Sequence, residues 1–281
     1  VYEDHVECLN DNGDLLPVHL TLIAIQYDQN VQNCNFVFIL HNEADLIQRQ
    51  KTAEEAKLKS ENLLYHILPE DIVMRLNSGE KDICFTVPSA TIIFIDVVKF
   101  SEYAKNLTPQ QIMGTLTALF SQFDNNADNY SLMRKIKLIG DVYMAAAGLF
   151  SDGQNPSEHA NQTVRFALDC LMSVDYVNMS VNSNLSVRIG VNTGGPIIAG
   201  VLGTDKPVFD IIGDTINVAS RLQSTDIPGN VQIPESTLSL LDKDEYTIEP
   251  RGEVFLKGKG QVQTYLIVPN PLSYGAKLYG S

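Results

Sequence analysis

The sequence predicts an α+β fold of ferredoxin-like plan for the larger, C-terminal part of the chain. From Ser89 onward, apolar segments of strand length alternate with helical segments in the order strand, helix, strand, strand, helix, strand. Thr108 and Gln111 have the spacing of a capping box, which marks the start of the first helix. Gly140 and Asp141 separate two strand-like segments and predict a turn there. We therefore expect a βαββαβ domain.

The first strand of this domain, Thr91–Asp96, is almost wholly apolar until its last residue, as expected of a buried strand. The helix that begins after Thr108 is expected to run to about Tyr130. The next elements are expected at residues 135–139, 142–147, 157–178 and 185–191. Two more strands are expected at 197–202 and 208–212. They are followed by a helix at 215–222 with Asp214 as its N-cap, and by a strand–helix–strand tail that ends near Val268.

Residues 1–42 read as β-hairpins with no helix to cover them. Strand-like segments at 18–25 and 36–40 lie beside turn signals at 11–14 and 28–35. Three strands alone do not close a core easily. We therefore expect this segment to be the end of a domain that begins upstream.

Residues 43–80 change character and predict a helical linker. Residues 43–68 contain neither Gly nor Pro, and apolar or small residues recur along them with a 3-4 spacing. Ala, Ser and Arg weaken the middle of this seam, so two interpretations stay open: a solvated single helix, or a parallel two-stranded coiled coil of low stability. Pro69 ends the helix, and Glu70 and Asp71 suit the first turn of a short following helix.

The charge balance argues against several partners. The chain has 20 Lys and Arg against 34 Asp and Glu, a formal net charge of −14, which disfavours binding to nucleic acid or to anionic lipid. No segment approaches the roughly 20 apolar residues of a membrane helix. Because the chain begins at Val1, we interpret it as a fragment of a longer protein. We expect this fragment to lie on the cytoplasmic side and to make no membrane contact, whereas the full-length protein could carry a membrane anchor. The four cysteines and five histidines look scattered, with no metal-ligand spacing.

Two aspartates are placed where phosphoryl chemistry needs them. Asp96 ends a buried strand, and Asp141 lies at the tip of the predicted hairpin. A carboxylate at the end of a buried strand is costly unless it is paired or binds a cation. Two such groups on neighbouring strands suit two divalent ions about 3.5–4 Å apart. The alternative is a pair of turn-capping aspartates.

Polar residues elsewhere suit a nucleotide. Asn217 and Arg221 are four residues apart and so share one helix face. Such a pair can hold a ribose and stabilise developing phosphorane charge, although a surface polar pair is the simpler reading. Lys257 lies in a Gly-flanked loop that would let an ammonium group approach phosphate.

Several long motifs, in a fixed order, resemble those of one protein family. The segments Thr91–Ser101, Lys135–Met144, Arg188–Gly194 and Phe209–Arg221 resemble the class III nucleotidyl cyclases. Leu63–Pro69 resembles the helical lead-in to their catalytic domain, and the match extends over residues 60–268. One departure is Lys99, where the family often has Gly beside the phosphates.

The resemblance implies a mechanism with two Mg²⁺ or Mn²⁺ ions. Asp96 and Asp141 would hold the ions, assisted by the carbonyl of Val97. Asn217 would orient the ribose, Arg221 would stabilise the transition state and Lys257 would hold the terminal phosphates. In the family these two sets come from opposite protomers, so a head-to-tail homodimer is implied, joined through the catalytic domain and the linker helix.

The resemblance also implies the substrate. Lys137 and Asp210 match the family's adenylyl-type positions, where Lys donates to adenine N1 and Asp accepts from N6. The alternative is that these two residues pair with each other without reading a base. We therefore expect an adenylate cyclase that converts ATP to 3′,5′-cyclic AMP and pyrophosphate in intracellular signalling. The alternatives are a guanylate cyclase and a catalytically silent dimerising or nucleotide-sensing module.

The expected domain boundaries follow from these observations. Residues 81–281 would be the cyclase domain, residues 43–80 the signalling helix, and residues 1–42 the last strands of a PAS-like sensor domain, which they resemble in composition and hairpin spacing.

Overall fold

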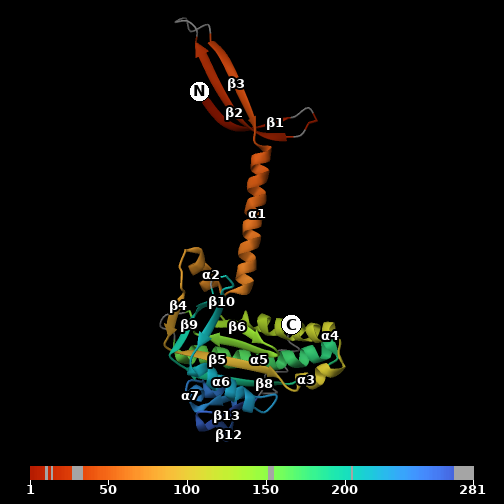
Figure 1. The fold of residues 1–281 in the computed structure, drawn as a ribbon, viewed down its shortest axis with the longest axis vertical. Helices are drawn as coiled ribbons and strands as arrows, with labels where there is room; N and C mark the ends of the chain where they lie inside the picture. The colour runs from red at the N-terminus through yellow and green to blue at the C-terminus, as the bar shows by residue number, and fades with distance from the viewer. Residues whose placement is uncertain (10–11, 14, 27–33, 151–154, 204, 269–281) are drawn as a thin grey trace. The chain divides into compact units, whose positions relative to one another are not determined.

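The structure is a computed structural model that describes all residues except 10–11, 14, 27–33, 151–154, 204 and 269–281. The chain divides into two compact units, Val1–Ile67 and Leu68–Ser281. Each unit is built around its own strands (Figure 1). No described helix is both long enough and apolar enough to span a lipid bilayer.

A seven-stranded sheet in the order β12-β13-β11-β8-β5-β7-β6 forms the centre of the C-terminal unit. Its inner part, β8-β5-β7-β6, has the strand order of a ferredoxin-like fold, which confirms the predicted βαββαβ plan. The elements of this part are β5 (Ala90–Val97), α4 (Pro109–Ala127), β6 (Met133–Ile139), β7 (Val142–Ala147), α5 (Pro156–Val181) and β8 (Val187–Gly194).

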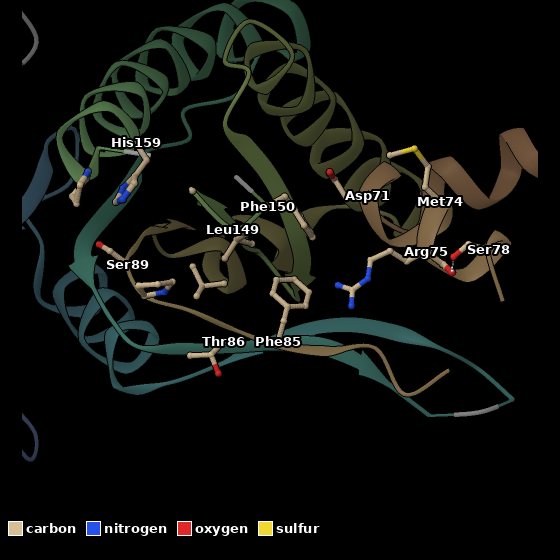
Figure 2. A pocket seen from close by; sticks show the side chains of 14 residues that line it. Asp71, Met74, Arg75, Ser78, Phe85, Thr86, Ser89, Leu149, Phe150 and His159 are labelled. Carbon is tan, nitrogen blue, oxygen red and sulfur yellow. Dashed lines mark hydrogen bonds between the residues drawn. The ribbon is translucent and has the colours of Figure 1, made fainter. Parts of the chain in front are cut away.

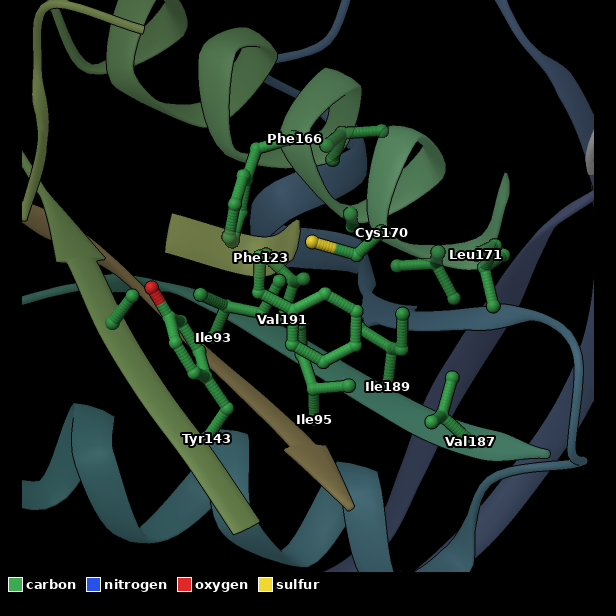
Figure 3. Packing of buried hydrophobic residues seen from close by; sticks show 14 of the residues in the cluster. Ile93, Ile95, Phe123, Tyr143, Phe166, Cys170, Leu171, Val187, Ile189 and Val191 are labelled. Carbon is green, nitrogen blue, oxygen red and sulfur yellow. The ribbon is translucent and has the colours of Figure 1, made fainter. Parts of the chain in front are cut away.

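Helices α4 and α5 pack on one face of this sheet and bury its main core. Phe123, Phe166, Tyr143 and Ile189 are each fully buried there (Figure 3). The predicted capping box sets the start of α4, because the Gln111 N–H donates to Thr108 Oγ1 at 3.2 Å and the Thr108 N–H donates to Gln111 Oε1 at 2.9 Å. This packing fixes the strand ends at which the acidic residues lie.

A second, smaller core contains residues of α2 (Glu70–Asn77), α6 (Asp214–Thr225) and a three-stranded sheet in the order β10-β9-β4. Phe85 and Phe150 pack against this core and line a pocket beside it (Figure 2). These strands are β4 (Cys84–Val87), β9 (Ile197–Leu202) and β10 (Val208–Ile212), and β4 was not predicted. The expected N-cap of α6 was wrong: Gly213 holds that position. The Asp214 carboxylate instead pairs with Lys259 Nζ at 2.5 Å.

The rest of the C-terminal unit comprises short helices and the far edge of the sheet. The expected strand–helix–strand tail has one strand more than predicted, because β12 and β13 pair as an antiparallel hairpin. The elements are α3 (Phe100–Tyr103), η1 (Ala104–Asn106), β11 (Val231–Pro234), α7 (Glu235–Leu238), η2 (Lys243–Glu245), β12 (Thr247–Leu256) and β13 (Gly260–Val268).

The N-terminal unit is an antiparallel sheet in the order β1-β2-β3, followed by the helix α1. The strands are β1 (Tyr2–Leu9), β2 (Leu15–Gln26) and β3 (Cys34–Asn42), and α1 covers Ala44–Ile67 as predicted. Parts of both predicted turns, at 10–11, 14 and 27–33, lie outside the described residues. Leu46, Leu58 and Leu63 of α1 are exposed in the single chain.

Candidate active site

The fold brings Asp96 and Asp141 to the same end of neighbouring strands. Asp96 is the penultimate residue of β5 and pairs in register with Val142, the first residue of β7. Asp141 lies in the tight turn before β7, and its carbonyl accepts the Val97 N–H at 3.4 Å. The two aspartates are therefore adjacent, as the sequence predicted.

The carboxylate of Asp96 is mostly buried, with 13% of its side chain exposed, and it is held by two donors. Arg188 Nη2 lies 2.5 Å from Asp96 Oδ2, and Gln223 Nε2 donates to the same oxygen at 2.9 Å. Arg188 lies in one of the motifs identified in the sequence, but no role was predicted for it. The register explains its position, because Arg188 on β8 lies directly opposite Asp96 on β5.

These residues fit a divalent cation. Two carboxylates and a nearby backbone carbonyl are hard oxygen donors, and Mg²⁺ commonly takes one or two carboxylates and completes its shell with water and substrate phosphates. Within the described residues no group of three or more His, Cys, Asp or Glu side chains is placed to hold an ion, so the substrate phosphates would have to complete the site. Lys99, which follows this strand, adopts the left-handed region at φ 53°, a conformation that glycine enters most easily.

Lys137 and Asp210, far apart in the sequence, form an ion pair. Lys137 Nζ on β6 lies 2.6 Å from Asp210 Oδ2 on β10. Both side chains are partly exposed, by 35% and 20%, so both remain accessible to a ligand. The structure thus brings together the two residues that were predicted to read the base.

Asn217, Arg221 and Lys257 form a second group. Asn217 and Arg221 lie one turn apart on α6, and Lys257 lies in the turn between β12 and β13. That turn is close to Arg221, because a Cβ built on Gly258 would lie 3.6 Å from Arg221 Nη1. Among the described residues, no hydrogen bond or ion pair joins Asp96 or Asp141 to any of these three. One chain therefore contains both groups, and no direct bond joins them in the part of the chain that the structure describes.

Buried polar residues support the strand that positions Arg188. Asp226 Oδ2 accepts the Ile189 N–H at 3.0 Å, and burial raises the pKa of this carboxyl to about 7 despite that bond. Arg251 Nη1 lies 4.0 Å from the other oxygen of Asp226. These contacts hold the end of α6 against β8.

Comparison with known proteins identifies the family. The sequence model of the adenylate and guanylate cyclase catalytic domain matches residues 86–269. The chain belongs to this family of cyclases. The matched segment contains every residue discussed above as a site residue.

Curated relatives match most of this chain but only part of their own length. Over 224 residues the chain is 36% identical to human atrial natriuretic peptide receptor 2, and this match covers 79% of this chain and 21% of the receptor. It is 34% identical to the human guanylate cyclase soluble subunit beta-2, over 76% of this chain and 34% of that protein. The chain thus spans about a fifth to a third of these curated relatives.

Solved structures agree on the fold. The guanylate cyclase domain of RhGC from Catenaria anguillulae in complex with GTP matches with a TM-score of 0.61 and 32% identity, covering 66% of this chain and 99% of that one. The adenylyl cyclase CyaB from P. aeruginosa matches with a TM-score of 0.62 and 26% identity, covering 66% of this chain and 96% of that one. Class III cyclase architecture is therefore shown for the C-terminal unit.

Proposed function

We propose that this chain is an adenylate cyclase that converts ATP to 3′,5′-cyclic AMP and pyrophosphate. The observation that carries the choice of ATP is the 2.6 Å pair of Lys137 and Asp210. Adenine offers an acceptor at N1 and a donor at N6. A lysine that donates beside a carboxylate that accepts is complementary to that edge, whereas guanine presents an acceptor at O6 and donors at N1 and N2.

In the proposed reaction the ribose 3′-oxygen attacks the α-phosphorus, the bond from that phosphorus to the bridging oxygen breaks, and pyrophosphate leaves. Two divalent ions held by Asp96, Asp141 and the Val97 carbonyl would supply Lewis-acid activation of the 3′-hydroxyl and charge neutralisation. Asn217 orients the ribose. Arg221 donates to the oxygens on which negative charge develops. Lys257 holds the terminal phosphates.

The proposed active unit is a head-to-tail homodimer with two composite sites. Membership of the cyclase family supports this arrangement, because in that family the metal-binding aspartates and the Asn, Arg and Lys set of one site come from opposite protomers. One similar solved structure, the guanylyl cyclase domain of the RhoGC fusion protein from Blastocladiella emersonii, is described as a non-canonical dimer, at 29% identity and a TM-score of 0.58. Another structure of that domain is described as monomeric. Each chain carries both half-sites, which suits two identical protomers.

A guanylate cyclase is the second candidate, because one curated relative named above is a guanylate cyclase subunit that is 34% identical over 76% of this chain. Overall identity does not decide the base, however. One similar solved structure is the catalytic core of a rhodopsin-guanylyl cyclase with converted specificity in complex with ATPalphaS, at 32% identity and a TM-score of 0.59. We therefore give the two base-facing residues more weight than the identity of the whole domain.

A specificity swap tests the proposal. Lys137→Glu together with Asp210→Cys replaces the proposed adenine-reading pair with the residues usual in guanylyl-type members, and it should shift the ratio of kcat/KM toward GTP. Lys135→Gln is the matched control, because Lys135 is on the same strand but pairs with Asp124 at 2.7 Å. An unchanged ATP/GTP ratio in the double variant would refute the base assignment.

The upstream residues would regulate this activity. We assign residues 1–42 to the end of a PAS-like sensor, residues 43–80 to a signalling linker and residues 81–281 to the catalytic domain. In this proposal α1 pairs with its copy in the dimer, and a change in that pairing alters the geometry of both composite sites.

A further inference from the structure

Three of the chain's five histidines lie in one row across the N-terminal sheet. His5 on β1 pairs directly with His19 on β2, and His19 pairs directly with His41 on β3. Directly opposite residues of an antiparallel ladder point to the same face of the sheet. Strand register thus joins three histidines that are far apart in the sequence.

The rings of His5 and His19 are close to each other, and a hydrogen bond orients the ring of His5. The ring centroids of His5 and His19 are 4.9 Å apart, with 23° between the ring planes. His5 Nδ1 lies 2.9 Å from Glu43 Oε2, so the carboxylate accepts a hydrogen bond from that nitrogen. Ligating histidines in metal sites typically have this kind of carboxylate partner, which leaves the other ring nitrogen as a ligand. The His5 side chain is 76% exposed, so an ion can reach it.

The surroundings favour a cation. Glu3 and Glu7 lie two residues before and after His5 on β1, and side chains two apart on a strand share a face. With Glu43 they place three carboxylates around the row. Imidazole ligands favour Zn²⁺, Cu²⁺ or Ni²⁺ over Mg²⁺.

We propose that His5, His19 and His41 bind one transition-metal ion of the Zn²⁺ class, with Glu43 positioning His5. In the rotamers of the structure no described group of three or more ligating side chains is ready to hold an ion, so binding requires the exposed rings to turn. Cβ atoms of neighbouring strands are about 4.5–5.5 Å apart, within reach of a shared ion bound at about 2.0–2.1 Å from each nitrogen. The site lies wholly within the N-terminal unit. Glu43 links it to the start of α1, because the Ile47 N–H donates to the Glu43 carbonyl at 2.9 Å.

Calorimetric titration of the full chain with Zn²⁺ in excess Mg²⁺ tests this proposal. Both the parent chain and Asp141→Asn, which lacks one proposed active-site carboxylate, should bind one Zn²⁺ per chain at the histidine row. His19→Ala, and separately His41→Ala, should lose more than about 100-fold in affinity, and Glu43→Gln should lose about 10–100-fold. Thr21→Ala, on the same strand and face, and Cys8→Ser should bind as the parent does.

Hydrogen exchange gives a second readout that does not depend on enzymatic activity. Zn²⁺ should slow amide exchange in β1, β2 and β3 of the parent chain but not of His19→Ala, whose fold is checked by circular dichroism. Parent-like Zn²⁺ affinity in both His19→Ala and His41→Ala would overturn the proposal. Absence of Zn²⁺ binding to the N-terminal unit of the parent would overturn it as well.

Discussion

Arg188 and Asp96 face each other across two central strands, and Arg188 Nη2 lies 2.5 Å from Asp96 Oδ2. The same oxygen also accepts a hydrogen bond from Gln223 at 2.9 Å. These two contacts hold a mostly buried carboxylate at the strand end, next to the turn that contains Asp141. The register of the sheet therefore positions the two aspartates that are proposed to bind the metal ions.

Removing either carboxylate should abolish cyclisation. Loss of an outer-shell partner of a metal ligand costs about 10–100-fold, so Asp96→Ala or Asp141→Ala should cost more than about 100-fold in kcat/KM. Analytical ultracentrifugation should show unchanged dimerisation. Asp175→Asn, an exposed aspartate on α5, is the control and should retain activity. Near-normal turnover in Asp141→Ala would contradict the metal assignment.

Mixing two inactive chains should restore activity if the sites are shared. In a heterodimer of Asp96→Ala with Arg221→Ala, one site carries both lesions and the other carries none. Random pairing makes half of the dimers mixed, so the mixture should recover about a quarter of the wild-type activity. Asp96→Ala mixed with Asp141→Ala should recover none, because every site then lacks a carboxylate. Failure of the first mixture in verified heterodimers would refute the composite site.

Helix α6 should be sensitive to any atom added between it and β8. A Cβ at Gly190 would lie 2.1 Å from the backbone N of Gln223 and 2.5 Å from the Ala219 carbonyl oxygen, so α6 must shift in Gly190→Ala. We expect a loss of about 1–3 kcal/mol in the free energy of unfolding and reduced turnover, because Asn217 and Arg221 move with the helix. Gly114→Ala in α4 is the matched control: nothing lies within 4 Å of the added Cβ, and stability should rise by roughly 0.5–1 kcal/mol. Equal effects of the two substitutions would contradict this packing argument.

The stability of the C-terminal unit should depend on pH through Asp226. Burial raises the pKa of its carboxyl from 3.8 to about 7 in the folded chain, so the folded state binds this proton more tightly. The contribution is present below pH ~4 and is lost as the pH rises to ~7, by up to roughly 4 kcal/mol. Urea unfolding should therefore show the wild type falling relative to Asp226→Asn over this window. A pH-independent difference between the two proteins would show that Asp226 is ionised when buried.

Local patterns predicted the βαββαβ plan, and the resemblance to the class III cyclases implied the two groups of site residues. Apolar runs, the Thr108 capping box and the spacing of Asn217 and Arg221 each reflect one element at a time. The contacts that depend on register were not predicted, including Arg188 beside Asp96 and the histidine row. The short strand β4 was missed for a related reason: its four residues carry little periodicity, and it forms by pairing with β9.

The most direct test of the central claim is the ratio of kcat/KM for ATP and GTP, measured with the purified chain in Mg²⁺ and in Mn²⁺ over a range of protein concentrations. A shared adenine-reading site predicts cyclic AMP as the main product and a specific activity that rises with protein concentration. It also predicts a preference for ATP of at least about tenfold, because the loss of one hydrogen bond of ~1.4 kcal/mol would give that ratio. Cyclic GTP product in excess over cyclic AMP would show that Lys137 and Asp210 do not read adenine. No cyclic product from a verified dimer would show that the domain is a silent regulatory module.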